Sequence, residues 1–166
     1  MFTALIAICA QIAIPQPGGV PFTLQVWAVS LAGLILGPKN GTIAVLVYVL
    51  LGAIGAPVFA AFTGGFGVIL RPTGGFILSF PVVALLAGLG GRKGGIMWVV
   101  LGLAAGTVFN LTAGLLWFNW VTELGLVVSF GYAVAPFIIT DAVRTAVLPV
   151  ISKSIKAAMQ RAKITC

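Results

Sequence analysis

The segment GIMWVVLGLAAGTVFNLTAGLLWFNW, residues 95–120, carries no charged side chain over its whole length. About 17 to 25 consecutive apolar residues are enough to cross a bilayer as an α-helix. The rest of the chain has the same character: 61% of its 166 residues are hydrophobic, 7% are charged, and the mean hydropathy is +1.23. Soluble domains carry about 25% charged residues. The sequence therefore predicts an all-α integral membrane protein.

Clusters of glycine and proline divide the remainder into further apolar segments, since both residues interrupt helices or form turns. The separators are PQPGGVP, GPKNG, FTGGFGVILRPTGG, GRKGG and TELGLVVSFGY. We expect six transmembrane helices in a single domain that covers residues 1–166. They should occupy residues 2–14, 22–36, 42–61, 75–89, 95–120 and 134–151. The first, within MFTALIAICAQIAI, is short for a span, so either it is tilted among its neighbours or some upstream sequence has been lost.

The basic residues predict the orientation, because such residues accumulate at the cytoplasmic ends of membrane spans. With six spans, seven of the nine basic residues fall on one face, and both termini should be cytoplasmic. The tail SKSIKAAMQRAKITC is expected to extend the last helix into the headgroup zone. Arg71, Arg144, Glu123 and Asp141 fall towards the outer face, which the charge rule does not explain. The seven residues are Lys39, Arg92, Lys93, Lys153, Lys156, Arg161 and Lys163.

Several functional classes are disfavoured by what the sequence lacks. The net charge of +7 comes without a dense basic run, so we expect no nucleic-acid partner. There is no histidine, and Cys9 and Cys166 lie at opposite ends of the chain, so neither a metal site nor a disulfide is expected. Neither GxSxG nor GxxxxGK[ST] occurs. We therefore expect no enzymatic activity, no cofactor and no ATP site in this chain.

The segment PFIITDAVRT, residues 136–145, holds one of the two acidic residues of the chain. Asp141 and Arg144 are three positions apart and so lie on one face of a helix. A charge in the hydrocarbon region is costly unless it is paired, so the two residues either neutralise each other structurally or bind a ligand. If Pro136 occupies the first turn, Asp141 lies about 7 Å below the helix start, a depth that suits the floor of a pocket open to the outside.

Other candidates for ligand contact lie in and after the long third separator. Thr73, Gly74 and Gly75 stand at the expected start of the fourth helix, where free N–H groups could bind a ligand. The alternative is a re-entrant turn without ligand contact. Asn110, in the middle of the fifth span, could bind either a neighbouring helix or a ligand. Glycines that allow close approach of a ligand are Gly64, Gly65, Gly67, Gly74 and Gly75.

Aromatic residues gather near the expected outer ends of the helices. They are typical of an interfacial belt, although one or two could line an apolar pocket. These residues are Trp27, Trp117, Phe118, Trp120 and Tyr132.

Five motifs in this order, VPFTLQ, LAGLILGPKNG, GAPVFA, PTGG and PFIITDAVRTAVL, closely resemble the BioY family over about residues 5–152. That family consists of the biotin-specific substrate-capture subunits of energy-coupling factor (ECF) transporters. The resemblance implies a multi-pass, substrate-binding subunit of the plasma membrane that captures biotin from the outside. It also implies two kinds of partner, a transmembrane coupling subunit and two cytoplasmic ATPases.

The resemblance also suggests roles for individual residues. Family members usually carry an aspartate followed three positions later by a lysine in the biotin site, and these positions are Asp141 and Arg144 here. Arg71 stands where the family usually has glycine; it could meet the carboxylate of biotin or extend to the headgroups. The small residues of the first helix resemble the face that meets the coupling subunit, although internal packing explains them equally well. They are Ala4, Ala7, Ala10 and Ala13.

Two alternatives remain open from the sequence. The chain could be a self-sufficient secondary carrier that moves a vitamin without ATPases. It could also be a membrane scaffold in which Asp141 and Arg144 only pair with each other.

Overall fold

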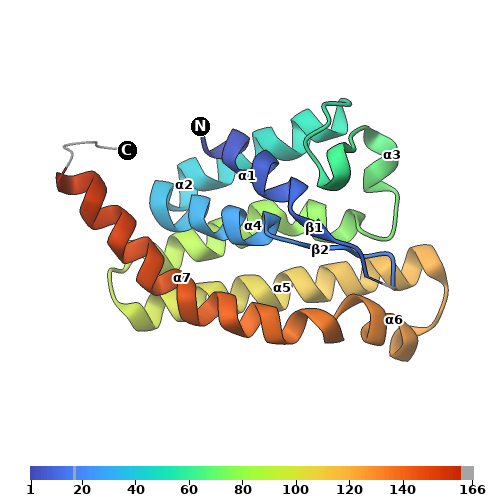
Figure 1. The fold of residues 1–166 in the computed structure, drawn as a ribbon. Helices are drawn as coiled ribbons and strands as arrows, with labels where there is room; N and C mark the ends of the chain where they lie inside the picture. The colour runs from blue at the N-terminus through green and yellow to red at the C-terminus, as the bar shows by residue number, and fades with distance from the viewer. Residues whose placement is uncertain (17, 162–166) are drawn as a thin grey trace.

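The structure, a computed structural model, describes residues 1–16 and 18–161 of the chain. Long helices lie side by side in it, and the expected all-helical class is confirmed apart from two strands of two residues each (Figure 1). The elements are α1 (Phe2–Gln11), β1 (Ala13–Ile14), β2 (Phe22–Thr23), α2 (Gln25–Ala53), η1 (Ala60–Phe62), α3 (Phe66–Ile69), α4 (Gly74–Arg92), α5 (Ile96–Thr122), α6 (Leu126–Ala133) and α7 (Ala135–Arg161).

Within the described residues, four helices are long and apolar enough to cross a membrane, where the sequence predicts six. They are α2, α4, α5 and α7. The difference has two sources. Helix α1 has ten residues, which rise about 15 Å and cover half of a hydrocarbon core of about 30 Å. The element α2 contains two of the predicted helices.

The element α2 is a pair of antiparallel helices that reverse direction at Gly37. This glycine has φ 83° and ψ 176°, a conformation that only glycine adopts readily, and Pro38 then opens the second helix. The reversal brings Gln25 Nε2 within 2.7 Å of the Tyr48 hydroxyl. In a continuous helix, residues 23 positions apart would be about 35 Å apart. The break between the predicted segments 22–36 and 42–61 is therefore real.

Several predicted helix boundaries are wrong, three of them where the chain is not helical. The segment 2–14 ends as a helix at Gln11, and 22–36 begins at Gln25, because the residues between them form an antiparallel hairpin with the pairs Ala13↔Thr23 and Ile14↔Phe22. The prolines of PQPGGVP exclude a helix there. The segment 42–61 ends at Ala53, after which the chain is irregular and then forms η1 and α3.

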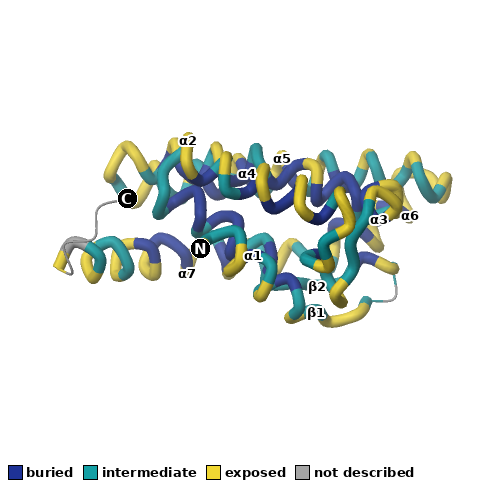
Figure 2. The backbone as a smooth tube through the Cα atoms, turned by 90° about the horizontal axis from the view of Figure 1, so that it is seen from above, coloured by how far each residue is buried: buried dark blue, intermediate teal, exposed yellow. Residues whose placement is uncertain are grey.

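The helices form two layers. Figure 2 shows α2, α4 and α5 in one layer, with α1, the β1–β2 hairpin and α7 in the other. Helix α4 is the central element, because 61% of its apolar 18-residue stretch is buried. The corresponding share is 22% to 28% in the three other candidate spans. A glycine seam makes this layer compact: a Cβ on Gly33 would collide with the Ala84 carbonyl oxygen of α4, and a Cβ on Gly90 would collide with the Trp98 carbonyl oxygen of α5.

One end of the molecule collects the basic residues, as the charge pattern predicts. The reversal at Pro38 packs against Gly88 near the end of α4, and Lys156 of α7 donates to the Gly91 carbonyl at 3.4 Å. Lys93 lies over the Trp98 ring, 3.6 Å from its centre. Lys163 and Cys166 lie outside the described residues. The basic residues on elements that meet or end here are Lys39, Arg92, Lys93, Lys153, Lys156 and Arg161.

The small residues of α1 do not share one environment. Ala10 is fully buried, as is Ile6, whereas Ala4 is exposed and Ala7 is half-buried. Ala13 lies in β1, beyond the end of the helix. Internal packing therefore accounts for Ala10. The exposed face of α1 consists of Met1, Ala4, Leu5, Ile8 and Ile12 near its end.

The glycine seam can be tested by Gly33→Ala. The added methyl group would overlap the Ala84 carbonyl, which belongs to a helix backbone and cannot move alone, so α2 and α4 must separate. We expect a loss of about 1–3 kcal/mol, measured as a lower thermal-unfolding midpoint in detergent. Gly131→Ala is the matched control, since a Cβ there meets nothing within 4 Å and improves the helix propensity of α6. Equal stability of the two variants would contradict a tightly packed seam.

Candidate functional site

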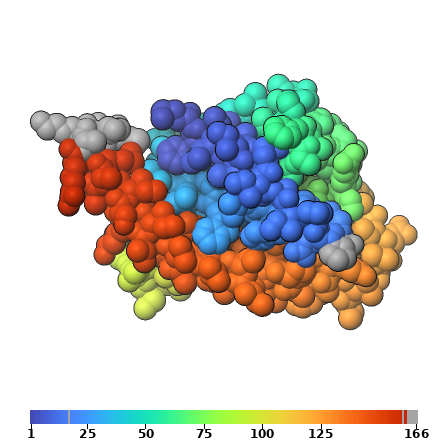
Figure 3. Space-filling view, viewed as in Figure 1, coloured from blue at the N-terminus to red at the C-terminus, as the bar shows by residue number. Residues whose placement is uncertain are grey.

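A cavity of about 470 Å³ lies between the two layers, within the range of about 300–1,000 Å³ typical of small-molecule sites. The β1–β2 hairpin, the start of α2, the segment after α2, and helices α4, α5 and α7 contribute its walls. In Figure 3, the segment that carries the hairpin lies between the green α3 region and the orange α7. The cavity is thus built by residues from nearly the whole length of the chain.

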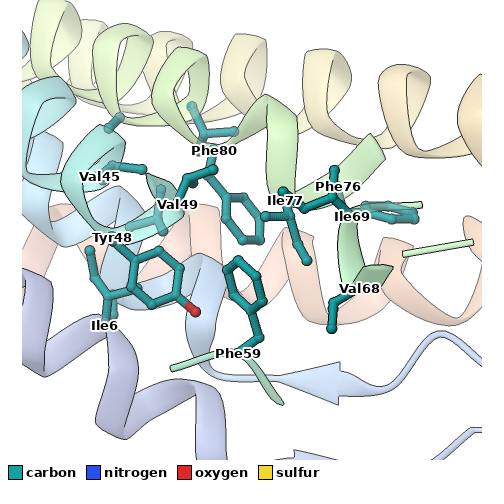
Figure 4. Close-up of a cluster of buried hydrophobic side chains, with 14 of the residues drawn as sticks. Ile6, Val45, Tyr48, Val49, Phe59, Val68, Ile69, Phe76, Ile77 and Phe80 are labelled. Carbon is teal, nitrogen blue, oxygen red and sulfur yellow. The ribbon is translucent and has the colours of Figure 1, made fainter. Parts of the chain in front are cut away.

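Aromatic side chains make most of the cavity wall apolar. Phe59 and Phe80 point towards each other in Figure 4, and both line the cavity. The edge of the Phe59 ring also packs against Tyr48, with ring centres 5.7 Å apart. Phe76 meets Phe137 of α7 at 6.2 Å between centres. Such a wall suits an apolar ring system, which can then be oriented by a small number of polar groups.

Asp141 is the acidic group of the cavity. It lies six residues into α7, about 9 Å along the helix from Ala135, and 13% of its side chain is exposed. Its Oδ1 is 3.2 Å from Nη1 of Arg144, so the predicted proximity of the two residues on one helix face is confirmed. The carboxylate therefore enters the cavity with a cation already beside it.

Arg144 lies behind Asp141 and stands outside the cavity lining in the described part of the chain. Its side chain is fully buried, and its Nη2 donates to the Thr107 hydroxyl of α5. Its Nε has no hydrogen-bond partner among the described residues, and its Nη1 makes the ion pair with Asp141 without the geometry of a hydrogen bond. Arg144 therefore contacts Asp141, which lines the cavity, without lining the cavity itself.

Arg71 and Thr73 line the cavity where the third separator meets α4. Arg71 is exposed, and its carbonyl accepts a hydrogen bond from Trp117 Nε1 at 3.1 Å. The cavity thus has an exposed cation in one part of its lining and a largely buried carboxylate, Asp141, in another.

Gly74 and Gly75 do not line the cavity in the described residues. The N–H of Gly74 already donates to the Arg71 carbonyl at 2.9 Å. A Cβ on Gly75 would collide with the Trp117 side chain of α5. Gly75 therefore allows α4 and α5 to approach closely, and Gly74 does the same for the α3 backbone at Ile69. Their expected contact with a ligand stays a prediction.

Asn110 bonds a neighbouring helix, which is one of the two roles that the sequence left open, and it also lies where a ligand could reach it. It is 3% exposed, its Oδ1 lies 2.6 Å from the Ser79 hydroxyl of α4, and it also lines the cavity. The contact with Ser79 fixes the amide while leaving it at the cavity wall.

Sequence reasoning missed two residues in or beside this site, Gln25 and Thr107. Gln25 is a buried amide in the lining and lies within the motif VPFTLQ, where a polar residue opens an apolar helix. Trp27, for which the sequence left open a belt or a pocket, does line the cavity. Thr107 had no signal in the sequence, because a threonine within a span more often bonds its own helix, as Thr107 also does through the Leu103 carbonyl.

Known proteins resemble this chain over nearly its whole length. A sequence model described as the BioY family matches residues 1–161. A probable biotin transporter BioY from Pyrococcus horikoshii is 41% identical over 94% of this chain and 92% of its own. A biotin transporter BioY from Thermotoga maritima is 40% identical over the same shares. These relatives are transporters, in agreement with the expectation that the chain is not an enzyme.

A solved structure has the same fold. The crystal structure of the S-component for biotin from an ECF-type ABC transporter aligns with a TM-score of 0.84. It is 29% identical and is matched over 94% of this chain and 87% of its own. The resemblance seen in the sequence motifs is thereby confirmed, and the chain belongs to the BioY family.

Proposed function

We propose that the protein is the biotin-binding S-component of an ECF-type transporter and that it captures biotin from outside the cell. The observation that carries the proposal is the cavity, in which a buried, paired carboxylate lies within aromatic walls. It is supported by the relatives named as biotin transporters and by the structural likeness to an S-component for biotin.

The chemistry of biotin matches the polar groups of the cavity. The ureido ring offers two N–H donors, which a carboxylate such as Asp141 accepts in strong, charge-assisted hydrogen bonds. The amide of Asn110 can complement the ureido group as donor or acceptor. The carboxylate of the valeryl chain is anionic, and Arg71 is the cation in the lining that can meet it. The phenylalanine side chains of the lining supply apolar surface for the thiophane ring and the alkyl chain.

Arg144 supports this arrangement from behind. An unpaired carboxylate in a low-dielectric site favours its neutral form, in which it accepts fewer hydrogen bonds. The adjacent guanidinium keeps Asp141 ionised and aimed at the ligand. Thr107 in turn fixes the guanidinium from α5.

The proposed partners follow from the likeness to an S-component of an ECF-type transporter: a transmembrane coupling subunit and two cytoplasmic ATPases, which supply the energy for uptake. The absence of an ATP-binding motif from this sequence fits that division of labour. The end of the molecule that collects the basic residues faces the cytoplasm. Both termini lie on that side, and the chain forms one plasma-membrane domain whose six helices include α1 and the two halves of α2.

Asp141→Asn tests the assignment of the carboxylate. Loss of the charge should weaken biotin binding at least tenfold in detergent-purified protein, measured by isothermal titration calorimetry, because neutral amides accept weaker hydrogen bonds from N–H groups. Glu123→Gln removes the other acid of the chain, which lies outside the cavity lining, and should leave the affinity unchanged.

Folding must be separated from binding in this test, since Asp141→Asn leaves Arg144 buried without its partner. The double variant Asp141→Leu/Arg144→Met removes both charges and should remain folded. We expect it to lose biotin binding while keeping its thermal stability. Unchanged affinity in the double variant would support a purely structural ion pair and contradict the proposal.

Arg71→Ala tests the opposite end of the ligand. We expect biotin to bind about tenfold more weakly, whereas biotin methyl ester, which has no carboxylate charge, should bind the variant and the wild type equally well. An equal loss for both ligands would show that Arg71 does not recognise the carboxylate. No loss for either would place Arg71 at the headgroups.

Reconstitution of the chain alone in lipid vesicles distinguishes the S-component from a secondary carrier. The proposal predicts stoichiometric binding of radiolabelled biotin without net accumulation, and accumulation only when coupling and ATPase subunits are added with ATP. Sustained uptake by the chain alone would contradict the need for partners.

A further inference from the structure

Gln11, the last residue of α1, holds the turn formed by residues 59–62 on both sides. Its Nε2 donates to the Phe59 carbonyl at 3.2 Å, and its Oε1 accepts from the Phe62 N–H at 2.8 Å. The same Nε2 donates to the Ala7 carbonyl at 2.9 Å, one turn earlier in α1. One side chain therefore connects the end of α1 to both edges of a turn that lies about fifty positions later in the chain.

This turn is a strained part of the cavity wall. Ala61 has φ 55° and ψ 40°, and Phe62 has φ 54°, so two consecutive residues with side chains adopt the left-handed conformation. Such a conformation is unfavourable for L-residues and persists only when surrounding contacts impose it. Phe59, Ala60, Ala61 and Thr63 all line the cavity.

Different contacts hold the base of the turn, at Phe59 and Thr63, and its tip, at Ala61 and Phe62. At the base, Phe59 N–H donates to the Thr63 carbonyl at 2.9 Å, and the buried Phe59 ring packs on Tyr48. At the tip, Ala61 is exposed and 71% of the surface of Phe62 is exposed. The hydrogen bond from the Phe62 N–H to Gln11 Oε1 therefore links the tip to another element, α1.

We infer that Gln11 is a positioning residue: it holds this turn over the cavity and so sets the dissociation rate of the ligand. The inference rests on the proposed biotin-binding function. It gives α1 a specific role, because a displacement of its C-terminal end pulls on Phe59 and Phe62 and opens the cavity wall. A helix that moves against a partner could thus release the ligand without contacting it.

A comparison of Gln11→Ala with Thr3→Ala in the full chain tests the inference. Thr3 donates to the Ala44 carbonyl at 3.1 Å, so its substitution removes a contact between α1 and α2 at the other end of α1 and leaves the turn alone. We expect Gln11→Ala to raise the dissociation rate of biotin about tenfold in stopped-flow measurements. Thr3→Ala should leave that rate within twofold of wild type, even if both variants have equal thermal stability.

A glycine at position 61 should relieve the backbone strain of the turn and so rescue the Gln11→Ala variant. Glycine adopts the left-handed conformation of Ala61 without steric strain, so adding Ala61→Gly to Gln11→Ala should bring the dissociation rate back towards wild type. A merely structural role for Gln11 predicts the opposite, because a glycine would loosen the turn further. A faster dissociation in the double variant than in Gln11→Ala would overturn the inference.

Hydrogen exchange tests this role of Gln11 without any ligand. In the ligand-free protein, Gln11→Ala should accelerate amide exchange in a peptide covering residues 59–63, whereas Thr3→Ala should not. Unchanged exchange and an unchanged dissociation rate would refute the inference that Gln11 holds the turn. If the wild type bound no biotin, the proposed function would fail, while the exchange experiment would still decide the role of Gln11.

Discussion

Close contact between helix backbones is the constraint that organises this structure. Lipid tails are as apolar as leucine side chains, so the helices gain little from simply burying hydrophobic surface against each other. Gly33 against Ala84, and Gly90 against Trp98, instead bring α2, α4 and α5 together through their backbones. Because backbone contacts hold α2, α4 and α5 together, the second layer can contain irregular segments. The cavity lies where these two kinds of packing meet.

The irregular segments then face a second demand, since backbone polar groups at membrane depth need partners within the protein. Gln11 supplies them for the turn at Phe59 and Phe62, and Tyr48 does so for the Val58 carbonyl, to which it donates at 2.9 Å. These bonds come from α1 and α2, and Gln11 is 48 to 51 positions from its partners in the turn. Glutamine and tyrosine side chains therefore make a non-helical cavity wall possible beside apolar helices.

The ion pair in α7 shows how a costly group is retained. Asp141 and Arg144 are buried where isolated charges would be strongly disfavoured, and each reduces the cost of the other. Only Asp141 of the two lines the cavity, so the pair is asymmetric: the carboxylate lies at the cavity wall and the guanidinium contacts Thr107. This geometry favours a supporting role for the arginine in the binding that we propose.

Composition and local spacing were sufficient for the membrane setting, the approximate helix positions and the common face of Asp141 and Arg144, because all of these depend on residues close together in the chain. The resemblance of the motifs to the BioY family added the prediction that the ligand is biotin. Only the tertiary structure decided that Gly74 and Gly75 pack against Trp117, that Gln25 lines the cavity, and that Gln11 holds the turn after α2. Those assignments depend on which helix faces each residue, and helical periodicity identifies a face without identifying its neighbour.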